Sequence, residues 1–124
     1  MTKRYDCIIA GFGTAGAVAA IAAGRKGASV LVLERGTCPG GTHTAGGIGW
    51  YYIQKPIGLM AELDEKCRQL TEDGWTVHLC EPKKHVLEQE AVKNGVEIRY
   101  EAVISACHLE NGLIRRIHWT DPAG

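Results

Sequence analysis

Two short apolar runs, at 7–10 and 30–33, are separated by an alanine-rich stretch. Short apolar runs bounded by turn residues are typical of buried strands, and alanine has the highest helix propensity of all residues. Two strands joined by a helix pair in parallel, because the helix returns the chain to the same end of the sheet. The pattern therefore predicts a βαβ unit with parallel strands.

Beyond residue 58 the hydrophobic period changes several times. Leu59, Leu63 and Cys67 recur at helical spacing. Asp64 is one of the charged residues between them, which makes the predicted helix amphipathic. We expect, in order, a helix over 59–70, a short strand over 75–80, a second helix from Pro82 to Asn94 and a strand over 96–100.

A hairpin is predicted for the last part of the sequence. Apolar runs at 102–109 and 113–119 flank the pair Asn111-Gly112. Asparagine and glycine both accept the positive φ angles of a type I′ turn, so the pair predicts a tight connection between two antiparallel strands.

The turn after the first strand carries a binding motif. Gly11, Gly13 and Gly16 form the pattern G-x-G-x-x-G between a strand and a helix. The first glycine permits a tight turn, the second lets a diphosphate approach the backbone, and the third lets the helix pack against the strand. The helix that begins near Thr14 presents unpaired N–H groups and the positive end of its dipole. The motif predicts a dinucleotide-binding turn.

An acidic residue ends the second strand, where such a unit binds a ribose. Glu34 lies 18 positions after Gly16, and its carboxylate is suited to accept hydrogen bonds from both hydroxyls of an adenosine ribose. A carboxylate there repels a 2′-phosphate, so NADP is disfavoured. The alternative is a glycine turn and a solvated glutamate that only join a strand to a helix, and it explains fewer of the agreeing features.

Residues 36–58 differ from the rest of the sequence. Seven of the 16 glycines lie there, together with the aromatic triplet Trp50-Tyr51-Tyr52. Glycine at this density opposes both helix and strand. Long irregular segments of compact domains are usually functional, so we expect a loop that wraps a ligand in preference to a flexible linker.

Composition and charge exclude several classes of function. Hydrophobic residues make up 45% of the 124 residues, which is enough for one core and one domain. The 14 basic and 14 acidic residues cancel, so there is no electrostatic footprint for nucleic acid or an anionic membrane. We also expect neither a signal peptide nor a membrane span, because residues 2–4 are polar and no apolar run is long enough to cross a bilayer.

Cysteines and histidines suggest no framework of their own. The five cysteines are odd in number and contain no C-x-x-C pair, which fits neither a disulfide framework nor a zinc site. A reducing cytoplasm is the simplest setting, with Cys7 and Cys67 as small core residues. The five histidines show no ligand spacing, so we expect no metal.

The order of these parts resembles the N-terminal portion of FAD-dependent oxidoreductases, flavoproteins of the broad glutathione-reductase-like group. The likeness rests on the βαβ unit, on Glu34-Arg35 and on a G-G-T-x-T-x-G-G segment at 40–47. It implies an α/β fold over residues 1–124, with a Rossmann-like parallel sheet, a β-hairpin insertion and FAD as the cofactor. By this resemblance the residues expected at FAD are Gly11, Gly13, Thr14, Ala15, Gly16, Glu34, Arg35, Gly40, Gly41, Thr42, His43, Thr44, Gly46, Gly47, Ala102 and Val103.

The resemblance also implies an incomplete fold. Such proteins continue after the hairpin into a further strand, a substrate domain and a late Gly-Asp motif, which 124 residues do not contain. We therefore expect the N-terminal part of a larger flavoenzyme that acts on a small organic substrate, with its remainder in the same protein or on a second polypeptide. Two alternatives stay open: a thiazole-synthase-like protein that binds NAD, and a noncatalytic nucleotide-binding subunit.

The flavin supplies the hydride chemistry, so the sequence need not contain a nucleophile and a base. His43 is a weak catalytic candidate, as a proton donor or a site of flavin attachment, and the simpler interpretation is a loop histidine hydrogen-bonded to backbone. Cys38 has no cysteine at close spacing, which favours a packed or exposed thiol over a redox-active one. The triplet at 50–52 either walls a flavin or substrate pocket or packs in the ordinary way.

Overall fold

The computed structural model describes residues 2–52, 54–71 and 80–124. Its elements are β1 (Cys7–Ala10), α1 (Thr14–Arg25), β2 (Val30–Leu33), η1 (Gly41–His43), α2 (Gly58–Gln69), α3 (Cys80–Lys93), β3 (Glu97–Arg99), β4 (Val103–Glu110) and β5 (Leu113–Thr120). The helices and strands predicted within the described residues are confirmed, with bounds that differ by a few residues. The strand predicted over 75–80 falls at 75–79 outside the described residues, and Cys80 begins α3.

A parallel sheet forms the centre of the fold and confirms the βαβ unit. Its strand order is β1-β2-β3, with Cys7 opposite Val30 in one pair and Leu31 opposite Glu97 in the other. All four residues of β2 are buried, because helices cover one face of this strand and the hairpin covers the other. Within the described ranges no strand pairs with the second edge of β1.

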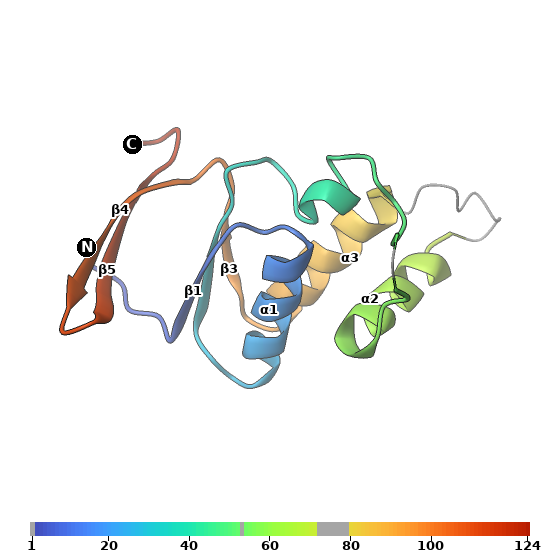
Figure 1. Ribbon diagram of the computed structural model, residues 1–124, viewed down its shortest axis with the longest axis horizontal. Helices are drawn as coiled ribbons and strands as arrows, with labels where there is room; N and C mark the ends of the chain where they lie inside the picture. Colours follow the sequence, from blue (N-terminus) through green and yellow to red (C-terminus); the bar gives the residue numbers. More distant parts are fainter. Residues whose placement is uncertain (1, 53, 72–79) are drawn as a thin grey trace.

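The elements are arranged in layers (Figure 1). The β4–β5 hairpin lies on one side of the sheet, α1 and α3 lie on the other, and α2 packs outside those two helices. The main core lies between the sheet and the helices, and its buried residues are Phe12, Ala17, Ala20, Ile21, Val30, Val32, Leu63, Cys67, Val86, Leu87, Ala91 and Val96. Cys67 is thus a core residue as predicted, and Cys7 packs against the same cluster while only partly buried.

The hairpin turns as the Asn-Gly pair predicts. Asn111 has a φ of +51° and Gly112 a φ of +76°, and a type I′ turn requires positive angles at both positions. Ile104, Ile117 and Trp119 pack against a small cluster that includes residues of β2. The hairpin therefore covers the second face of the sheet, and the predicted fold class, a parallel α/β sheet with a β-hairpin, is confirmed.

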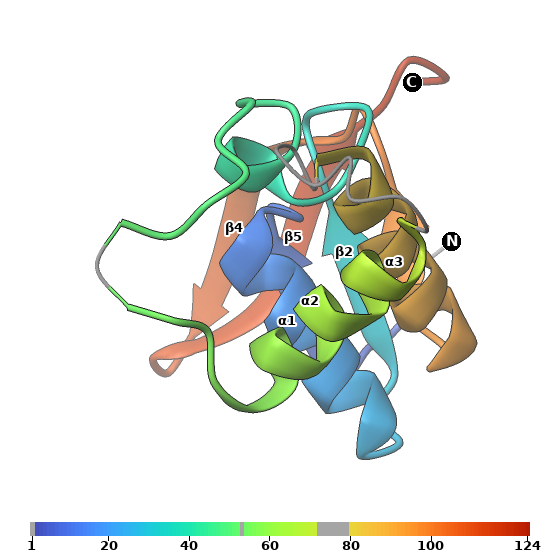
Figure 2. The ribbon, with the colours of Figure 1, turned by 90° about the vertical axis from the view of Figure 1, so that its right-hand side faces the viewer.

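An ion-pair network fastens the three long helices to one another. Arg25 of α1 donates to both carboxylate oxygens of Glu62 of α2, at 2.8 and 2.6 Å, and reaches Glu90 of α3 at 3.1 Å. Lys66 of α2 donates to Glu90 at 2.7 Å. Hydrogen bonds from Arg25 and then from Lys66 lower the pKa of Glu62 to about 2. Because α2 lies on the outside of α1 and α3 (Figure 2), these contacts help to fix its position.

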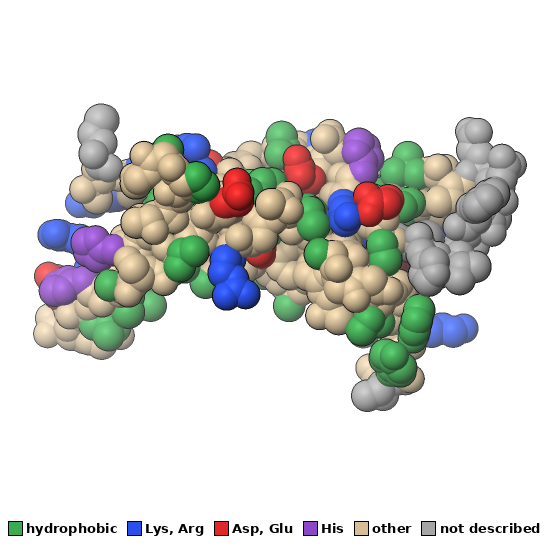
Figure 3. Space-filling model, turned by 90° about the horizontal axis from the view of Figure 1, so that it is seen from above, with side chains coloured by type: hydrophobic (Ala, Val, Ile, Leu, Met, Phe, Trp, Pro, Cys, Tyr) green, Lys and Arg blue, Asp and Glu red, His purple; other side chains and the backbone are tan. Residues whose placement is uncertain are grey.

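The surface carries charges of both signs. Acidic and basic side chains are interspersed over the face seen in Figure 3, in keeping with a formal net charge of zero. Among the helices of the described residues, none has the length and apolar character that crossing a bilayer requires.

Candidate functional site

The turn between β1 and α1 has the conformation that the glycine motif predicts. Gly11 has a φ of +96°, and its N–H donates to the carbonyl of Leu33 at 2.8 Å, which ties the turn to β2. A Cβ built on Gly16 would lie 2.0 Å from the carbonyl oxygen of Gly11. The fold itself therefore requires both glycines, Gly11 for its backbone angle and Gly16 for the close approach of helix and strand.

Gly13 differs, because nothing in the described protein requires a glycine there. Its φ is −66°, which any residue adopts, and a Cβ would meet no atom within 4 Å. It is the N-cap of α1, and no side chain caps this helix, whose first turn contains Thr14 and Ala15. The missing side chain leaves an open surface beside the positive end of α1, which is a favourable place for an anion.

Glu34 follows β2 and lies next to this open surface. Its carboxylate accepts hydrogen bonds from the backbone N–H groups of Phe12 and Gly36, each at 2.5 Å. Each carboxylate oxygen has two lone pairs, so the side chain keeps the capacity to accept further donors. The two backbone bonds thus orient a half-buried acid without exhausting it.

Three further predicted residues gather near Glu34. The N–H of Ala102 donates to the backbone carbonyl of Glu34 at 2.9 Å, and Val103 follows with an exposed side chain. Arg35, next in sequence, is exposed as well. These residues lie beyond the carboxyl ends of the parallel strands, which is where open α/β sheets bind their ligands.

The glycine-rich loop folds back onto the motif. The N–H of Gly40 donates to the carbonyl of Phe12 at 2.7 Å, and Thr14 Oγ1 donates to the carbonyl of Gly40 at 3.1 Å. A Cβ on Gly41 would lie 3.2 Å from the Cα of Gly13. In both ribbon views η1 sits over the beginning of α1 (Figures 1 and 2). The loop and the glycine turn therefore border one common surface.

The loop residues divide into those that hold its shape and those at its surface. Thr44 is buried, and its hydroxyl donates to the carbonyl of Pro39. A Cβ on Gly46 would lie 2.7 Å from backbone atoms of Thr42, so this position is closed by the loop itself. Thr42 and Gly47 are exposed. Cofactor contact stays a prediction for all four, and at Thr44 the hydroxyl already has a partner.

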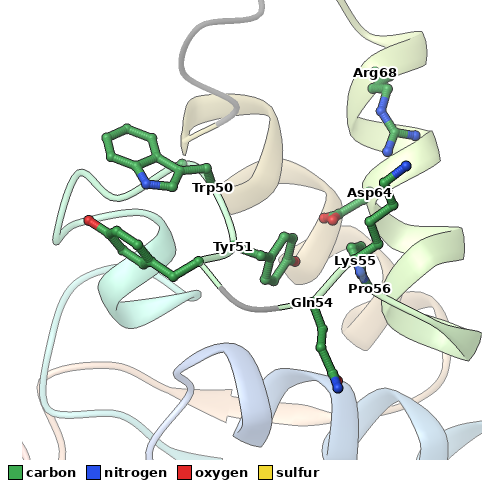
Figure 4. A pocket seen from close by; sticks show the side chains of 9 residues that line it. Trp50, Tyr51, Gln54, Lys55, Pro56, Asp64 and Arg68 are labelled. Atoms are coloured by element: carbon green, nitrogen blue, oxygen red, sulfur yellow. The ribbon is translucent and has the colours of Figure 1, made fainter.

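The aromatic triplet lines two cavities beside the glycine-rich loop, one of which extends to α2. One has a volume of about 340 Å³ and includes Asp64 and Arg68 in its wall (Figure 4). The other has a volume of about 470 Å³ and includes Thr42 and His43. Trp50, Tyr51 and Tyr52 contribute to both, and a flavin or substrate in either cavity stays a prediction.

A buried ion pair at the wall of the smaller cavity is not among the site residues predicted from the sequence. Lys83 of α3 and Asp64 of α2 lie 3.0 Å apart, with side chains 1% and 3% exposed. The amphipathic pattern of α2 predicts Asp64 on the polar face, and that prediction is wrong because a second helix covers the residue and supplies its counter-ion. Neither periodicity nor motif spacing relates positions on two different helices, so no sequence signal identified the pair.

His43 packs against the edge of this cluster. Its ring meets the Tyr51 ring edge-on, with the centroids 4.6 Å apart. The interpretation as a side chain hydrogen-bonded to backbone is wrong at Nδ1, which is buried and has no hydrogen-bond partner. Burial, followed by the charge of Lys83, lowers the pKa of His43, while Asp64 acts in the opposite direction.

The described cysteines and possible metal ligands indicate no separate site. All five cysteines are free, and Cys38 is half-buried. Burial raises the pKa of the Cys67 thiol to about 11, as suits a core residue. Within the part of the chain that the structure describes, no three His, Cys, Asp or Glu side chains gather as metal ligands.

Solved structures share this fold. The anhydrotetracycline hydroxylase OxyS from Streptomyces rimosus superimposes with a TM-score of 0.65 at 21% identity, covering 98% of this chain and 29% of its own. THI4 of Thermovibrio ammonificans gives 0.58 at 20% identity, covering 91% of this chain and 45% of its own. At these identities the likeness establishes a Rossmann-like fold and nothing about the reaction.

Two curated relatives and a family profile bear on the family of the chain. FixC of Salmonella typhi is 38% identical over 87 residues, covering 61% of this chain and 20% of FixC. The probable electron transfer flavoprotein-quinone oxidoreductase YgcN of Escherichia coli is 33% identical over 136 residues, covering 92% of this chain and 32% of YgcN. The chain thus spans less than a third of either relative. Because the profile described as FAD dependent oxidoreductase matches residues 6–124, the chain belongs to that family, and its cofactor is FAD.

Proposed function

We propose that residues 1–124 are the FAD-binding portion of a larger flavoenzyme, of the glutathione-reductase-like group, that acts on a small organic substrate. The glycine turn at 11–16 and the beginning of α1 hold the diphosphate, and Glu34 holds the adenosine ribose. The loop at 40–47 and the aromatic cavities lie toward the flavin. The rest of the enzyme, in the same protein or on a second polypeptide, completes the substrate site.

The surroundings of Gly13 carry this proposal. Packing and backbone angle explain Gly11 and Gly16, but neither explains Gly13, whose missing side chain leaves space within the site. This space has the uncapped helix start on one side, and the adjacent Phe12 binds the carboxylate of Glu34 through its N–H. N–H groups beside a carboxylate suit a ligand in which a diphosphate is joined to a ribose.

FAD, when bound, would supply the hydride or electron transfer, and the protein binds and orients it. Glu34 is held in place by Phe12 and Gly36 before any ligand arrives, so its orientation costs little entropy on binding. The same carboxylate disfavours a nucleotide with a 2′-phosphate.

A second candidate function is electron transfer from an electron transfer flavoprotein to a quinone. The relation to YgcN favours it, because that similarity covers 92% of this chain. The two candidates share the FAD site and differ in the electron donor. The NAD-binding thiazole-synthase-like alternative shares the glycine turn, the glutamate and a Gly-Gly segment, and the likeness to THI4 concerns the fold alone.

The test is to purify the protein that contains this chain and to identify what it binds. Visible flavin absorption that leaves the protein on denaturation, with the mass of FAD in the released fraction, supports the proposal. Released NAD or an adenylated thiazole would favour the thiazole-synthase-like alternative instead. If neither a flavin nor NAD or an adenylated thiazole is found, even with FAD added and the remainder of the enzyme supplied, the noncatalytic subunit is favoured.

The electron donor is identified in a second step without oxygen. Under the main proposal, a small organic substrate reduces the flavin and bleaches its visible absorption. Bleaching by a reduced electron transfer flavoprotein, followed by reoxidation with a quinone, would select the second candidate.

A further inference from the structure

A polar cluster beside the aromatic cavities contains two charged side chains that the FAD proposal does not use. It joins Lys83 of α3, Asp64 of α2, and Tyr51 and His43 of the glycine-rich loop. We infer that the Lys83–Asp64 pair is a positioning device that fixes Tyr51 and, through the Tyr51 ring, holds His43 as a hydrogen-bonding residue of the adjoining cavity. This role goes beyond the proposed function and does not depend on which cofactor binds.

A gain in stability does not explain why this ion pair is buried. Both side chains are almost fully buried, and taking two charges out of water offsets much of their mutual attraction. Apolar side chains of similar volume are often at least as stabilising at such positions. The alignment is also imperfect, because Asp64 Oδ1 lies 3.0 Å from Lys83 Nζ without forming a hydrogen bond. A positional role accounts for charges that packing alone does not need.

The pair acts directly on Tyr51. Lys83 Nζ donates to the Tyr51 hydroxyl at 3.2 Å and lies 5.0 Å from the centroid of its ring. In Figure 4 the Asp64 side chain extends from α2 toward Tyr51. Burial, and then the charge of Asp64, raises the pKa of the Tyr51 hydroxyl, so this group stays protonated. Contacts from two helices therefore fix one aromatic residue of the loop.

Tyr51 in turn holds His43. The two rings meet edge-on at an interplanar angle of 73°. Because His43 Nδ1 has no hydrogen-bond partner, packing against Tyr51 sets the orientation of the imidazole in place of a bond of its own. His43 lines the cavity of about 470 Å³. The chain of contacts thus runs from the ion pair to a side chain in the cavity wall.

The opposite charges of Lys83 and Asp64 act on the pKa of His43 in opposite directions, which provides a test. Among the described residues, the charged groups that act on His43 are Lys83 from α3 and Asp64 from α2, and they shift its pKa in opposite directions. A general loosening of the structure would expose His43 and raise its pKa, whichever member of the pair was changed. The sign of the shift on changing Asp64 therefore separates the inferred arrangement from a merely structural effect.

The experiment is an NMR pH titration of His43 in the full chain without added cofactor. Its signal is assigned by its loss in His43→Gln. We expect Lys83→Met to raise the pKa of His43 and Asp64→Asn to lower it. Lys84→Met serves as the matched control, because Lys84 is the next residue of α3 and pairs at the surface with Glu81. This variant should leave the pKa of His43 unchanged.

A rise in the pKa of His43 in Asp64→Asn, or no shift in either variant, would overturn the inference. If a single variant does not fold, the double variant Lys83→Met/Asp64→Leu decides, since it buries no unpaired charge. The nuclear Overhauser contact between the His43 and Tyr51 rings should weaken in it, and a contact of unchanged strength would overturn the inference too. FAD is absent throughout, so failure of the FAD proposal would leave these results as they are.

Discussion

Replacing Gly13 by alanine separates ligand binding from folding. The added methyl would meet no protein atom within 4 Å, and the φ of −66° suits alanine. Alanine is a poorer N-cap than glycine by about 0.5 to 1 kcal/mol. Loss of glycine also restricts the unfolded chain, which favours the fold by about 0.4 to 1 kcal/mol. The two effects nearly cancel, so Gly13→Ala should change the free energy of unfolding by less than about 0.5 kcal/mol.

Binding should respond much more strongly than stability. Under the proposed function the new methyl stands where the diphosphate approaches the backbone, and a lost hydrogen bond to a charged group costs about 1.5 to 3 kcal/mol. This loss corresponds to a dissociation constant for FAD that is roughly 10 to 150 times larger. The assay is a titration followed by flavin fluorescence, with urea unfolding of the same samples followed by circular dichroism.

Two matched variants complete this experiment. Gly16→Ala would place a Cβ 2.0 Å from the carbonyl oxygen of Gly11, so it should lose about 1 to 3 kcal/mol of stability along with FAD binding. Ala22→Ser alters an exposed position of α1 away from the turn. It should leave both the stability and the FAD binding nearly unchanged. The reasoning is refuted if Gly13→Ala binds FAD as tightly as the parent chain, or unfolds as readily as Gly16→Ala.

Three other changes test the fold. Leu87→Ala empties a fully buried core position and should lower the free energy of unfolding in urea by about 2 to 5 kcal/mol, whereas a loss below about 1 kcal/mol would contradict its place in the core. Gly112→Ala puts a side chain at a φ of +76° and should cost about 1 to 2 kcal/mol in thermal unfolding, with no cost expected only if the turn is of another type. The folded pKa of Glu62, about 2, lies below its ordinary value, so its stabilising effect is present above that value and disappears as the pH falls toward 2. Stability should therefore decline on acidification below about pH 5, and Glu62→Gln should make that decline shallower; an unchanged slope would contradict the helix network.

The β1–α1 turn could be predicted because its requirements are local. The angle at Gly11 and the close approach at Gly16 involve residues only a few positions apart. The same holds for the hairpin, where Asn111 and Gly112 alone determine the turn type. The position of Glu34 could be predicted from the length of the connection between the two strands. The end of a parallel strand is fixed once the helix before it is known.

The polar cluster could not be predicted, because its members meet only in the folded chain. Asp64 fits the polar face of its own helix, and its burial depends on where α3 crosses α2. The two loop threonines make the same point: Thr44 turns inward and Thr42 outward, although both belong to one short motif. Helical periodicity describes one element at a time, and the contacts that decide these roles lie between elements.

The central claim is that the β1–α1 turn and Glu34 hold the adenosine diphosphate half of FAD. A competition titration tests it most directly, with FAD bound to the chain and either ADP or FMN added. ADP carries the diphosphate and the adenosine ribose, whereas FMN carries the flavin with a single phosphate. We predict that ADP displaces FAD and that FMN displaces it far more weakly. Displacement by FMN with no effect of ADP would contradict the claim.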